Sequence, residues 1–492
     1  MTNPIVNLYA IAHHICMDSH TKIIATLGPA TNSAEMIEKL CKAGADVFRI
    51  NFSHGAADDH RKTAQTIRDV EKKIGRPIGI IADMQGPKLR IGTFTDGAIT
   101  LEQGQNFRFD LDETAGDNTR VNLPHPEVLK VLKSDAQIFL DDGNVRATVL
   151  KADKQGVDVR IDAGSKLSDK KGLNVPGVLI PIPALTPKDH KDLLTAIDMG
   201  ADWIAQSFVQ TVADVEQAKT LIDGRAALMV KLEKPAALED LDNIIALADG
   251  VMIARGDLGV EIPPERVPAA QKNIIRQCRQ AAKPVVVATQ MLESMVTNAR
   301  PTRAEASDVA TAVYDGTDAV MLSAETAVGQ YPERAVTIMS RICKTTEADE
   351  NYETIMDTRH PKTEDHDASD AIATAAYYVA QDVEATAIIT YTTSGSTALR
   401  MSRQRPFVPV LCMAGDQGVA RRLAVSYAVH AVYMADLNTK ISADLTGSAK
   451  LAGKILQQEN LAKPNDTFVM TAGVPFGEPG TTNLLRIGVV GS

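Results

Sequence analysis

Two carboxylates, each placed just after an apolar run, are the residues of this chain best suited to hold a metal ion. Residues 227–230 are apolar and lead into Lys231 and Glu233. Residues 251–254 are apolar and lead into Asp257, which lies in a glycine-rich turn. Carboxylates, water and substrate oxygens together are the usual ligands of Mg²⁺. The pattern predicts a magnesium site on Glu233 and Asp257, and the structural alternative is a buried ion pair with a neighbouring lysine or arginine.

Other apolar runs also end in polar residues that suit a phosphate-handling site. These residues are cations, hydroxyls and one further carboxylate: Arg49, Arg90, Thr289, Ser323 and Glu325. Arginine and lysine bind phosphate and carboxylate oxygens. The chain has neither a Walker A motif nor a Rossmann glycine fingerprint, so the usual nucleotide cradles are absent. Mg²⁺ with lysine and arginine at one rim indicates phosphoryl transfer or enolate chemistry, and spacing alone does not choose between them.

The apolar runs recur in a strand–helix rhythm that predicts an α/β fold, a (β/α)8 TIM barrel. Three strand candidates lie within residues 21–90 and five within residues 186–346. Ser33 is a suitable N-cap for the first helix, and Gly44 is a suitable end for it. Eight strand–helix repeats favour a closed barrel over an open sheet, and a parallel barrel collects its active site at the carboxyl ends of its strands.

Residues 91–185 interrupt this rhythm with short alternating runs and frequent glycines, which predict a small inserted β-barrel. We call residues 91–185 the insert. The polar residues 347–370 predict a linker, and residues 371–492 predict a C-terminal α/β domain. Residues 1–20 predict a loosely attached N-terminal arm.

The composition argues against several classes of partner. The 492 residues carry a net charge of -10, which argues against nucleic acid because phosphate neutralisation needs a basic face. No apolar run reaches the ~18 residues of a transmembrane helix, so we expect no membrane span. The five cysteines are scattered without metal-ligand spacing, which indicates reduced thiols in a cytoplasmic protein.

Seven motifs, in order along the chain from Thr21, resemble those of the pyruvate kinase family. They are RINFSHG (49–55), DMQGPKLR (83–90), KGLNVPG (171–177), MVKLE (229–233), ARGDLGVEIP (254–263), ATQMLESM (288–295) and SAETA (323–327). The resemblance implies transfer of a phosphoryl group from phosphoenolpyruvate to ADP, giving pyruvate and ATP at the end of glycolysis. It also implies Mg²⁺ (with Mn²⁺ as an alternative), a homotetramer and a phosphorylated allosteric effector.

The resemblance assigns roles to the residues at the rim. Glu233 and Asp257 match the family's Mg²⁺ ligands, and Lys231 matches the lysine that neutralises the transferring phosphoryl group and the enolate. Arg49 matches the arginine on the substrate phosphate. Gly256, Asp257 and Thr289 match the cradle of the substrate carboxylate. The proton donor to the enolate stays open between Thr289 and the Ser323/Glu325 pair, acting through water.

The nucleotide contacts implied by the resemblance are Asn51, His54, Arg90 and Lys171. Since Lys171 lies in the insert, the resemblance implies that the insert acts as a lid, which would exclude water from the site. Asp142 lies in the same insert, where a turn role is at least as good an interpretation as a functional one.

Lys88 stands where K⁺-dependent members of the family carry a glutamate. Positions matching the K⁺ ligands are Asn51, Ser53, Asp83 and the carbonyl of Met84, where the family's usual residue is threonine. We predict that the ammonium group of Lys88 takes the place of the monovalent cation, so that K⁺ is not required. The alternative is that Lys88 points into solvent and K⁺ still binds.

A turn in the C-terminal region matches the family's effector-phosphate loop. Its hydroxyl residues are Thr392, Thr393, Ser394, Ser396 and Thr397. Hydroxyls and backbone N–H groups at a helix start suit an anion. Thr393 stands where the eukaryotic type of this loop has a lysine, which weakens the case for fructose 1,6-bisphosphate as the effector. A sugar monophosphate or AMP is an equally good candidate. The alternative is a helix cap that binds nothing.

Two other functions compete with pyruvate kinase activity. A Mg²⁺-dependent aldolase or lyase acting on pyruvate enolate would share Glu233 and Asp257, but it would have no use for a nucleotide lid or Lys171. A non-catalytic metabolite sensor of the same fold would have no need for the full set of rim residues.

Overall fold

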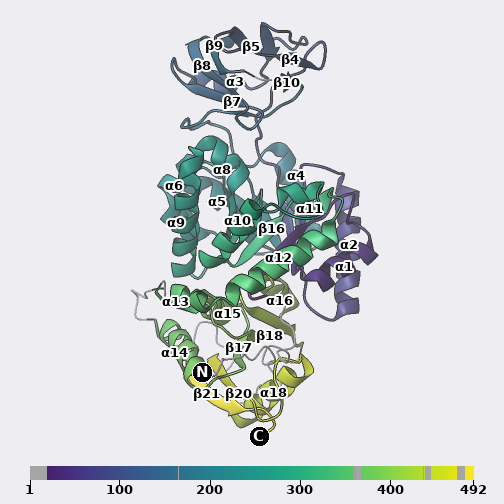
Figure 1. The fold of residues 1–492 in the computed structure, drawn as a ribbon, viewed down its shortest axis with the longest axis vertical. Coiled ribbons are helices and arrows are strands. Elements are labelled where there is room, and N and C mark those ends of the chain that lie inside the picture. Colours follow the sequence, from purple (N-terminus) through teal and green to yellow (C-terminus); the bar gives the residue numbers. More distant parts are fainter. Residues whose placement is uncertain are drawn as a thin grey trace, which may run out of the picture.

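The computed structural model describes residues 19–164, 166–358, 361, 367–435, 437, 445–473 and 482–492. Three regions follow one another along its longest axis: the insert, a closed barrel, and an α/β region at the other end (Figure 1). Residues 1–18 of the predicted arm lie outside the described residues. The backbone N–H of His20 donates to Glu347, so this end of the described chain is held against the barrel.

Eight of the described strands form a closed parallel barrel, which confirms the predicted TIM barrel. The barrel strands are almost entirely buried, because the helices cover one face of each strand and the barrel interior covers the other. This burial explains why the sequence shows continuous apolar runs rather than alternation. In order around the barrel they are β1 (Lys22–Thr26), β2 (Val47–Asn51), β3 (Gly79–Asp83), β12 (Trp203–Gln206), β13 (Ala227–Leu232), β14 (Gly250–Ala254), β15 (Val285–Ala288) and β16 (Ala319–Leu322).

The first barrel helix begins and ends at the predicted residues. Ser33 Oγ accepts the N–H of Met36, and Gly44 ends the helix with a φ of 117°. The helices around the barrel are α1 (Ala34–Ala43), α2 (Ala57–Ile74), α4 (Pro187–Asp198), α5 (Val212–Ile222), α6 (Pro235–Glu239), α7 (Leu241–Leu247), α8 (Arg255–Glu261), η1 (Pro264–Arg266), α9 (Val267–Gln280), η2 (Glu293–Val296), α10 (Arg303–Tyr314), α11 (Ala324–Ala327) and α12 (Pro332–Glu347).

The insert leaves the barrel after β3 and returns before α4, so it lies at the carboxyl ends of the strands (Figure 1). Its described strands form a six-stranded and a two-stranded sheet around one apolar cluster. A short helix, α3, also lies there and is too brief to show a helical period in the sequence. The elements are β4 (Ala98–Thr100), β5 (Asn106–Asp110), β6 (Arg120–Asn122), α3 (Pro126–Val131), β7 (Gln137–Leu140), β8 (Val145–Ala152), β9 (Gly156–Ala163), β10 (Lys166–Ser168) and β11 (Leu173–Asn174).

The C-terminal region is a five-stranded sheet of order β19-β18-β17-β20-β21, covered by helices. Part of the stretch predicted as a linker is the helix α13, whose Tyr352 and Met356 pack into the barrel core. Two buried side chains among polar neighbours left too weak a pattern to predict this helix. The elements are α13 (Glu350–Thr358), α14 (Ala368–Asp382), β17 (Ala387–Thr392), α15 (Ser396–Arg403), β18 (Val410–Ala414), α16 (Gln417–Leu423), β19 (Val429–Tyr433), α18 (Leu445–Gln458), β20 (Thr467–Gly473) and β21 (Thr482–Val489).

The C-terminal region closes the barrel at the end opposite the insert, which we call the floor. Ala424 and Val425 belong to the same apolar cluster as the side chains inside the barrel. The indole N–H of Trp203 donates to the carbonyl of Arg422 at 3.2 Å. The floor is therefore filled, and access is left at the opposite rim. No helix among the described residues is both long and apolar enough to cross a membrane.

Candidate active site

Inward-facing side chains at the carboxyl ends of five neighbouring strands form the centre of the candidate site. Each lies two residues beyond a side chain of the barrel interior, so the period of two along a strand directs it inward. The interior residues are Ile24, Val47, Ile81, Ala205 and Met229. The corresponding site residues are Thr26, Arg49, Asp83, Ser207 and Lys231.

Lys231 lies at the middle of this group. Its Nζ is 3.1 Å from Glu233 Oε1 and 3.2 Å from Asp83 Oδ1, and it donates to Ser207 Oγ at 2.7 Å. Burial lowers the pKa of Lys231, but the carboxylates of Asp83 and Glu233 outweigh burial, and the net shift is upward. Lys231 is therefore a charged ammonium group held in one position.

Asp83 holds two of the cations of the site. Its Oδ2 accepts a hydrogen bond from Arg49 Nε at 2.6 Å, while its Oδ1 faces Lys231. Burial raises the pKa of Asp83, but the charges of Lys231 and Arg49 more than offset burial, so its pKa lies below the ordinary value. Asp83 stays ionised and fixes both cations at the rim.

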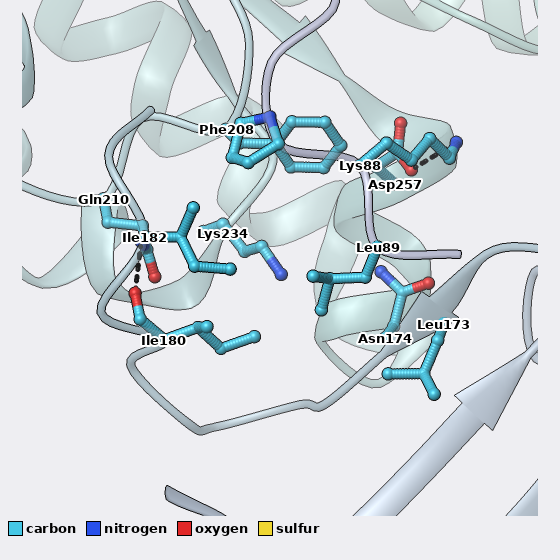
Figure 2. Close-up of a pocket in the computed structure, with 11 residues that line it drawn as sticks. Lys88, Leu89, Leu173, Asn174, Ile180, Ile182, Phe208, Gln210, Lys234 and Asp257 are labelled. Carbon is cyan, nitrogen blue, oxygen red and sulfur yellow. Dashed lines mark hydrogen bonds and ion pairs between the residues drawn. The ribbon is translucent and has the colours of Figure 1, made fainter. Parts of the chain in front are cut away.

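The negative charge of Glu233 is balanced by fewer nearby cations than that of Asp83. Burial, helped by the nearby charge of Asp257, raises the pKa of Glu233 against the opposing effect of Lys231. The N–H of Phe208 donates to Glu233 Oε2 at 2.8 Å. Asp257 Oδ1 lies 3.4 Å from Lys88 Nζ (Figure 2). The predicted alternative, a buried ion pair of Glu233 with Lys231, is thus also present, whereas Arg255 pairs with Asp308.

The donor set of Glu233 and Asp257 fits a divalent cation. The two carboxylates are close enough for Asp257 to raise the pKa of Glu233, and a bound cation would relieve that repulsion. The part of the chain that the structure describes contains no group of three or more His, Cys, Asp or Glu side chains arranged to hold a metal. Two carboxylates completed by water and substrate oxygens suit Mg²⁺.

Thr289 and Gly256 are brought together beside Asp257. Thr289 Oγ1 accepts the N–H of Gly256 at 2.8 Å and donates to the carbonyl of Ala288 at 2.6 Å. Thr289 has a φ of 69°, which is unusual for a β-branched residue. Arg255 Nη2 donates to the carbonyl of Thr289 at 2.9 Å and helps to hold this backbone. Such strain clusters at ligand-binding sites.

Ser323 and Glu325 meet through the backbone rather than through the serine hydroxyl. Glu325 accepts the N–H of Ser323 at 2.7 Å and the N–H of Leu292 at 3.1 Å. Burial raises the pKa of Glu325. In this geometry Glu325 anchors two loops of the rim.

Three of the four oxygens predicted to hold K⁺ accept hydrogen bonds from protein donors. The carbonyl of Met84 accepts Ser207 Oγ–H at 2.7 Å, and Asn51 Oδ1 accepts the N–H of Ser53 at 3.1 Å. Asp83 is bound to Arg49 and Lys231, as described above. Each of these three oxygens therefore has at least one hydrogen-bond donor from the protein. The contact observed for Lys88 is with Asp257 and not with the four predicted K⁺ ligands.

Two of the predicted nucleotide contacts lie together where the insert joins the barrel. Arg90 pairs with Gly172 in an isolated bridge and donates from Nη1 to the carbonyl of Lys170 at 2.9 Å. Lys171 Nζ lies 2.6 Å from Asp141 Oδ1. The other two contacts lie at the end of β2: Asn51 is its last residue, and the N–H of His54 donates to the carbonyl of Asn51 at 3.4 Å.

A cavity of about 500 Å³ lies between the insert and the barrel beside Asp257. Its lining includes Lys88, Gly256 and Gln290 from the barrel side and Asp142 from the insert. Asp142 has a φ of 55°, as expected of a turn residue, and it also faces this cavity.

The predicted effector loop connects β17 to α15. Thr392 Oγ1 accepts the N–H of Gly395 at 2.8 Å, and Gly395 has a φ of 95°. Ser394 Oγ donates to Ser396 Oγ at 3.2 Å. Thr397 Oγ1 lies 2.9 Å from Thr482 Oγ1, and Thr393 is half-buried. The loop gathers several hydroxyls around one helix start.

Sequence reasoning missed several residues that touch the predicted ones, among them Thr26, Ser207 and Phe208. Thr26 Oγ1 accepts a hydrogen bond from Arg49, and Ser207 binds Lys231. Counting two residues on from each barrel-interior position would have found Thr26 and Ser207. Phe208 acts through its backbone N–H, for which the sequence carries no signal.

The chain is similar to known proteins over nearly its whole length. Residues 18–336 match the family model described as "Pyruvate kinase, barrel domain", and residues 370–488 match "Pyruvate kinase, alpha/beta domain". The chain is 48% identical over 470 residues to a pyruvate kinase of Methylorubrum extorquens, covering 96% of this chain and 97% of that protein. It is 45% identical over 467 residues to one of Agrobacterium vitis, covering 95% and 97%. A crystal structure of a pyruvate kinase from Cryptosporidium parvum superposes with a TM-score of 0.88 at 33% identity and covers 96% of each chain.

Proposed function

The chain belongs to the pyruvate kinase family of phosphotransferases, which move a phosphoryl group from phosphoenolpyruvate to ADP, and we propose that Lys231, Glu233 and Asp257 carry this reaction here. The observation that supports the assignment best is the position of Lys231. Its ammonium group is buried at the strand-end rim, 3.1 Å from Glu233 and within the electrostatic reach of Asp257.

The residues suit the charge changes of the reaction. The bond between phosphorus and the enolate oxygen of phosphoenolpyruvate breaks, and a bond forms between phosphorus and a terminal phosphate oxygen of ADP. Negative charge develops on the enolate oxygen and the phosphoryl oxygens, and a fixed ammonium group such as Lys231 stabilises it without reorganisation. Arg49, held by Asp83, would bind the substrate phosphate. Gly256 and Thr289 would hold the substrate carboxylate.

Pyruvate kinases generally use Mg²⁺ and often K⁺. We propose Glu233 and Asp257 as the residues that hold Mg²⁺ or Mn²⁺. When bound, the divalent ion supplies positive charge beside the transferring group. The enolate then takes a proton at its methylene carbon. The proposed source, acting through water, stays open between Thr289 and the Ser323/Glu325 pair, because the Thr289 hydroxyl and the Glu325 carboxylate both already have backbone partners.

The insert is proposed to close over the site as a lid, with Asn51, His54, Arg90 and Lys171 binding ADP. Arg90 and Lys171 lie at the junction of insert and barrel, where closure would bring them toward the rim. Closure would keep water from accepting the phosphoryl group.

A coupled assay for ATP formed from phosphoenolpyruvate and ADP tests the proposal. We expect Mg²⁺-dependent ATP formation that Glu233→Gln abolishes. Carbon–carbon bond cleavage of a pyruvate-derived substrate without ATP formation would instead favour an aldolase or lyase. Effector binding without any turnover would favour a metabolite sensor.

K⁺ independence is proposed from the positive charge of Lys88. The ammonium group of Lys88 places a positive charge 3.4 Å from Asp257, inside the site rather than in open solvent. Rates measured with K⁺ replaced by tetramethylammonium should stay within about twofold. A collapse of the rate would refute the proposal, and Lys88→Glu should create a K⁺ requirement.

Regulation and assembly are proposed from the family. The loop from Thr392 to Thr397 would bind a phosphorylated effector. Calorimetry with AMP, a sugar monophosphate and fructose 1,6-bisphosphate would identify the effector, and binding of none of them would indicate that the loop is only a helix cap. A homotetramer is proposed, to be measured by light scattering. The four described cysteines are buried free thiols, which supports a reducing cytoplasmic location.

A further inference from the structure

A buried charged network lies directly behind the two proposed metal ligands. Lys234 Nζ is 2.6 Å from Glu261 Oε1, and the same oxygen accepts a hydrogen bond from Asn174 Nδ2 at 2.7 Å. The Glu261 side chain is 1% exposed and that of Lys234 is 10% exposed. Lys234 and Asn174 line a small cavity of about 20 Å³ between the barrel and the insert (Figure 2).

This network joins the two chain segments that carry the metal ligands. Lys234 follows Glu233 directly at the end of β13. Glu261 is the last residue of α8, and Asp257 lies in the first turn of the same short helix. The Lys234–Glu261 pair therefore fixes the end of β13 against α8. Because an unpaired buried charge is strongly unfavourable, the two segments have to move together.

Asn174 connects the insert to this pair. It belongs to β11, on the segment by which the insert returns to the barrel. The N–H of Leu173 donates to the carbonyl of Leu89 at 3.0 Å, so the outgoing and returning segments are tied together. The outgoing segment also carries Lys88, which contacts Asp257. Any displacement of the insert thus reaches α8 through Asn174.

Phe208 links the same network to Glu233. Lys234 Nζ lies 5.8 Å from the centre of the Phe208 ring, and the N–H of Phe208 donates to Glu233. Gly86 of the outgoing segment packs so closely that a Cβ there would lie 2.7 Å from the Phe208 ring. Both connections of the insert therefore touch residues that hold a metal ligand.

We propose that Asn174, Glu261 and Lys234 are positioning residues that set the separation of Glu233 and Asp257 and make metal affinity depend on the position of the insert. The proposal rests on the metal site described under the proposed function. Outer residues that orient metal ligands affect affinity by about 10- to 100-fold when removed.

Binding of Mn²⁺ alone to the whole enzyme, followed by electron paramagnetic resonance of the free ion, tests the proposal without turnover. Asn174→Leu keeps the side-chain volume and removes the donor, and we expect the Mn²⁺ dissociation constant to rise about tenfold. The matched control is Gln210→Met, because Gln210 Nε2 also holds the returning segment, through the carbonyl of Ile180 at 3.2 Å, but does not contact Glu261. We expect this control to stay within about twofold of the wild type.

A second variant, Asn174→Ser, covers the case in which Asn174→Leu does not fold. The serine side chain is too short to reach Glu261, and it disturbs the packing less than leucine does. Lys234→Arg keeps the charge and should keep the wild-type affinity within about threefold. Unchanged Mn²⁺ affinity in the Asn174 variants, or an equal loss in Gln210→Met, overturns the coupling while leaving the metal site intact. Failure of the wild type itself to bind Mn²⁺ overturns the metal site and the coupling together.

Discussion

At the floor of the barrel, the carboxylate of Asp318 accepts two hydrogen bonds from Arg405, two from backbone N–H groups and one from a serine hydroxyl. At the rim, Glu233 is also buried, and its partners among the residues that the structure describes are Lys231 and one backbone N–H. Both are ion pairs of acid with base, and both hold parts of the barrel together. They differ in how much of the bonding capacity of the carboxylate the protein itself uses.

The number of protein partners distinguishes a carboxylate with a structural role, Asp318, from one that is free to bind a ligand, Glu233. The Asp318–Arg405 pair is saturated, so it has nothing left to offer a ligand and its role is to dock the C-terminal region. Burial and the charge of Asp257 raise the pKa of Glu233 despite the nearby Lys231, as expected of a negative charge that its protein partners compensate only in part. A carboxylate in that condition gains free energy from a cation, and this is what a metal site needs.

The largest expected effect is at the rim. Lys231→Met should lower kcat by about 10³-fold, because it removes the fixed charge that we propose stabilises the enolate and phosphoryl oxygens. Steady-state rates with phosphoenolpyruvate and ADP measure it. A kcat within tenfold of the wild type would mean that Lys231 is structural, as the floor pairs are.

The matching change at the floor should destabilise rather than inactivate. Arg405→Met leaves Asp318 buried without its cation, and the free energy of unfolding should fall by about 3–5 kcal/mol. Denaturant unfolding measures this, with kcat at 15 °C expected within about threefold. The exposed pair Lys72–Asp69, broken by Lys72→Met, is the control and should change stability by no more than about 0.5 kcal/mol.

The pH dependence of stability should distinguish the under-compensated carboxylate. Since the folded pKa of Glu233 lies above its unfolded value, its contribution to stability is complete below the unfolded pKa of about 4.3 and is lost as pH rises through the raised folded pKa. As pH rises from 4, the melting temperature of the metal-free wild type should therefore fall relative to that of metal-free Glu233→Gln. Glu325, whose pKa is also raised, titrates in both proteins, so its effect cancels from the difference between their melting temperatures. A constant difference between pH 4 and 8 would show that Glu233 is as well compensated as Asp318.

The smallest expected effect is at Ser207. Ser207→Ala removes the hydroxyl that accepts from Lys231 Nζ, while Asp83 and Glu233 still hold the ammonium group. A single hydrogen bond to a charged group contributes about 1.5–3 kcal/mol, and because two partners remain, kcat should fall only about 3- to 10-fold. A loss as large as that of Lys231→Met would make Ser207 a direct participant.

The barrel and the candidate cluster at its rim were predictable for one physical reason. Parallel strands buried on both faces need continuous apolar runs, so charges such as Lys231 and Asp257 stand out where the runs end. The structure brings Lys231 into contact with Glu233, and also with Asp83, which was predicted only as a K⁺ ligand. The motif resemblance supplied their separate roles.

Other features had no local signal. Asp318 and Arg405 are 87 residues apart, and their pairing follows from how two regions dock. Phe208 contributes a backbone N–H, which any residue type provides. Ser207 and Thr26 are common residues that become significant only once the inward face of each strand is known. The contact of Lys88 with Asp257 depends on the path of the segment that enters the insert.

Trp203 gives the molecule a built-in optical reporter. It is the single tryptophan of the chain, it is nearly buried in β12, and its indole N–H donates to the carbonyl of Arg422 across the floor. Indole fluorescence shifts to longer wavelength when water replaces an apolar, hydrogen-bonded surrounding. Undocking of the C-terminal region would expose Trp203 to water, so a single emission spectrum can follow that event without any added label.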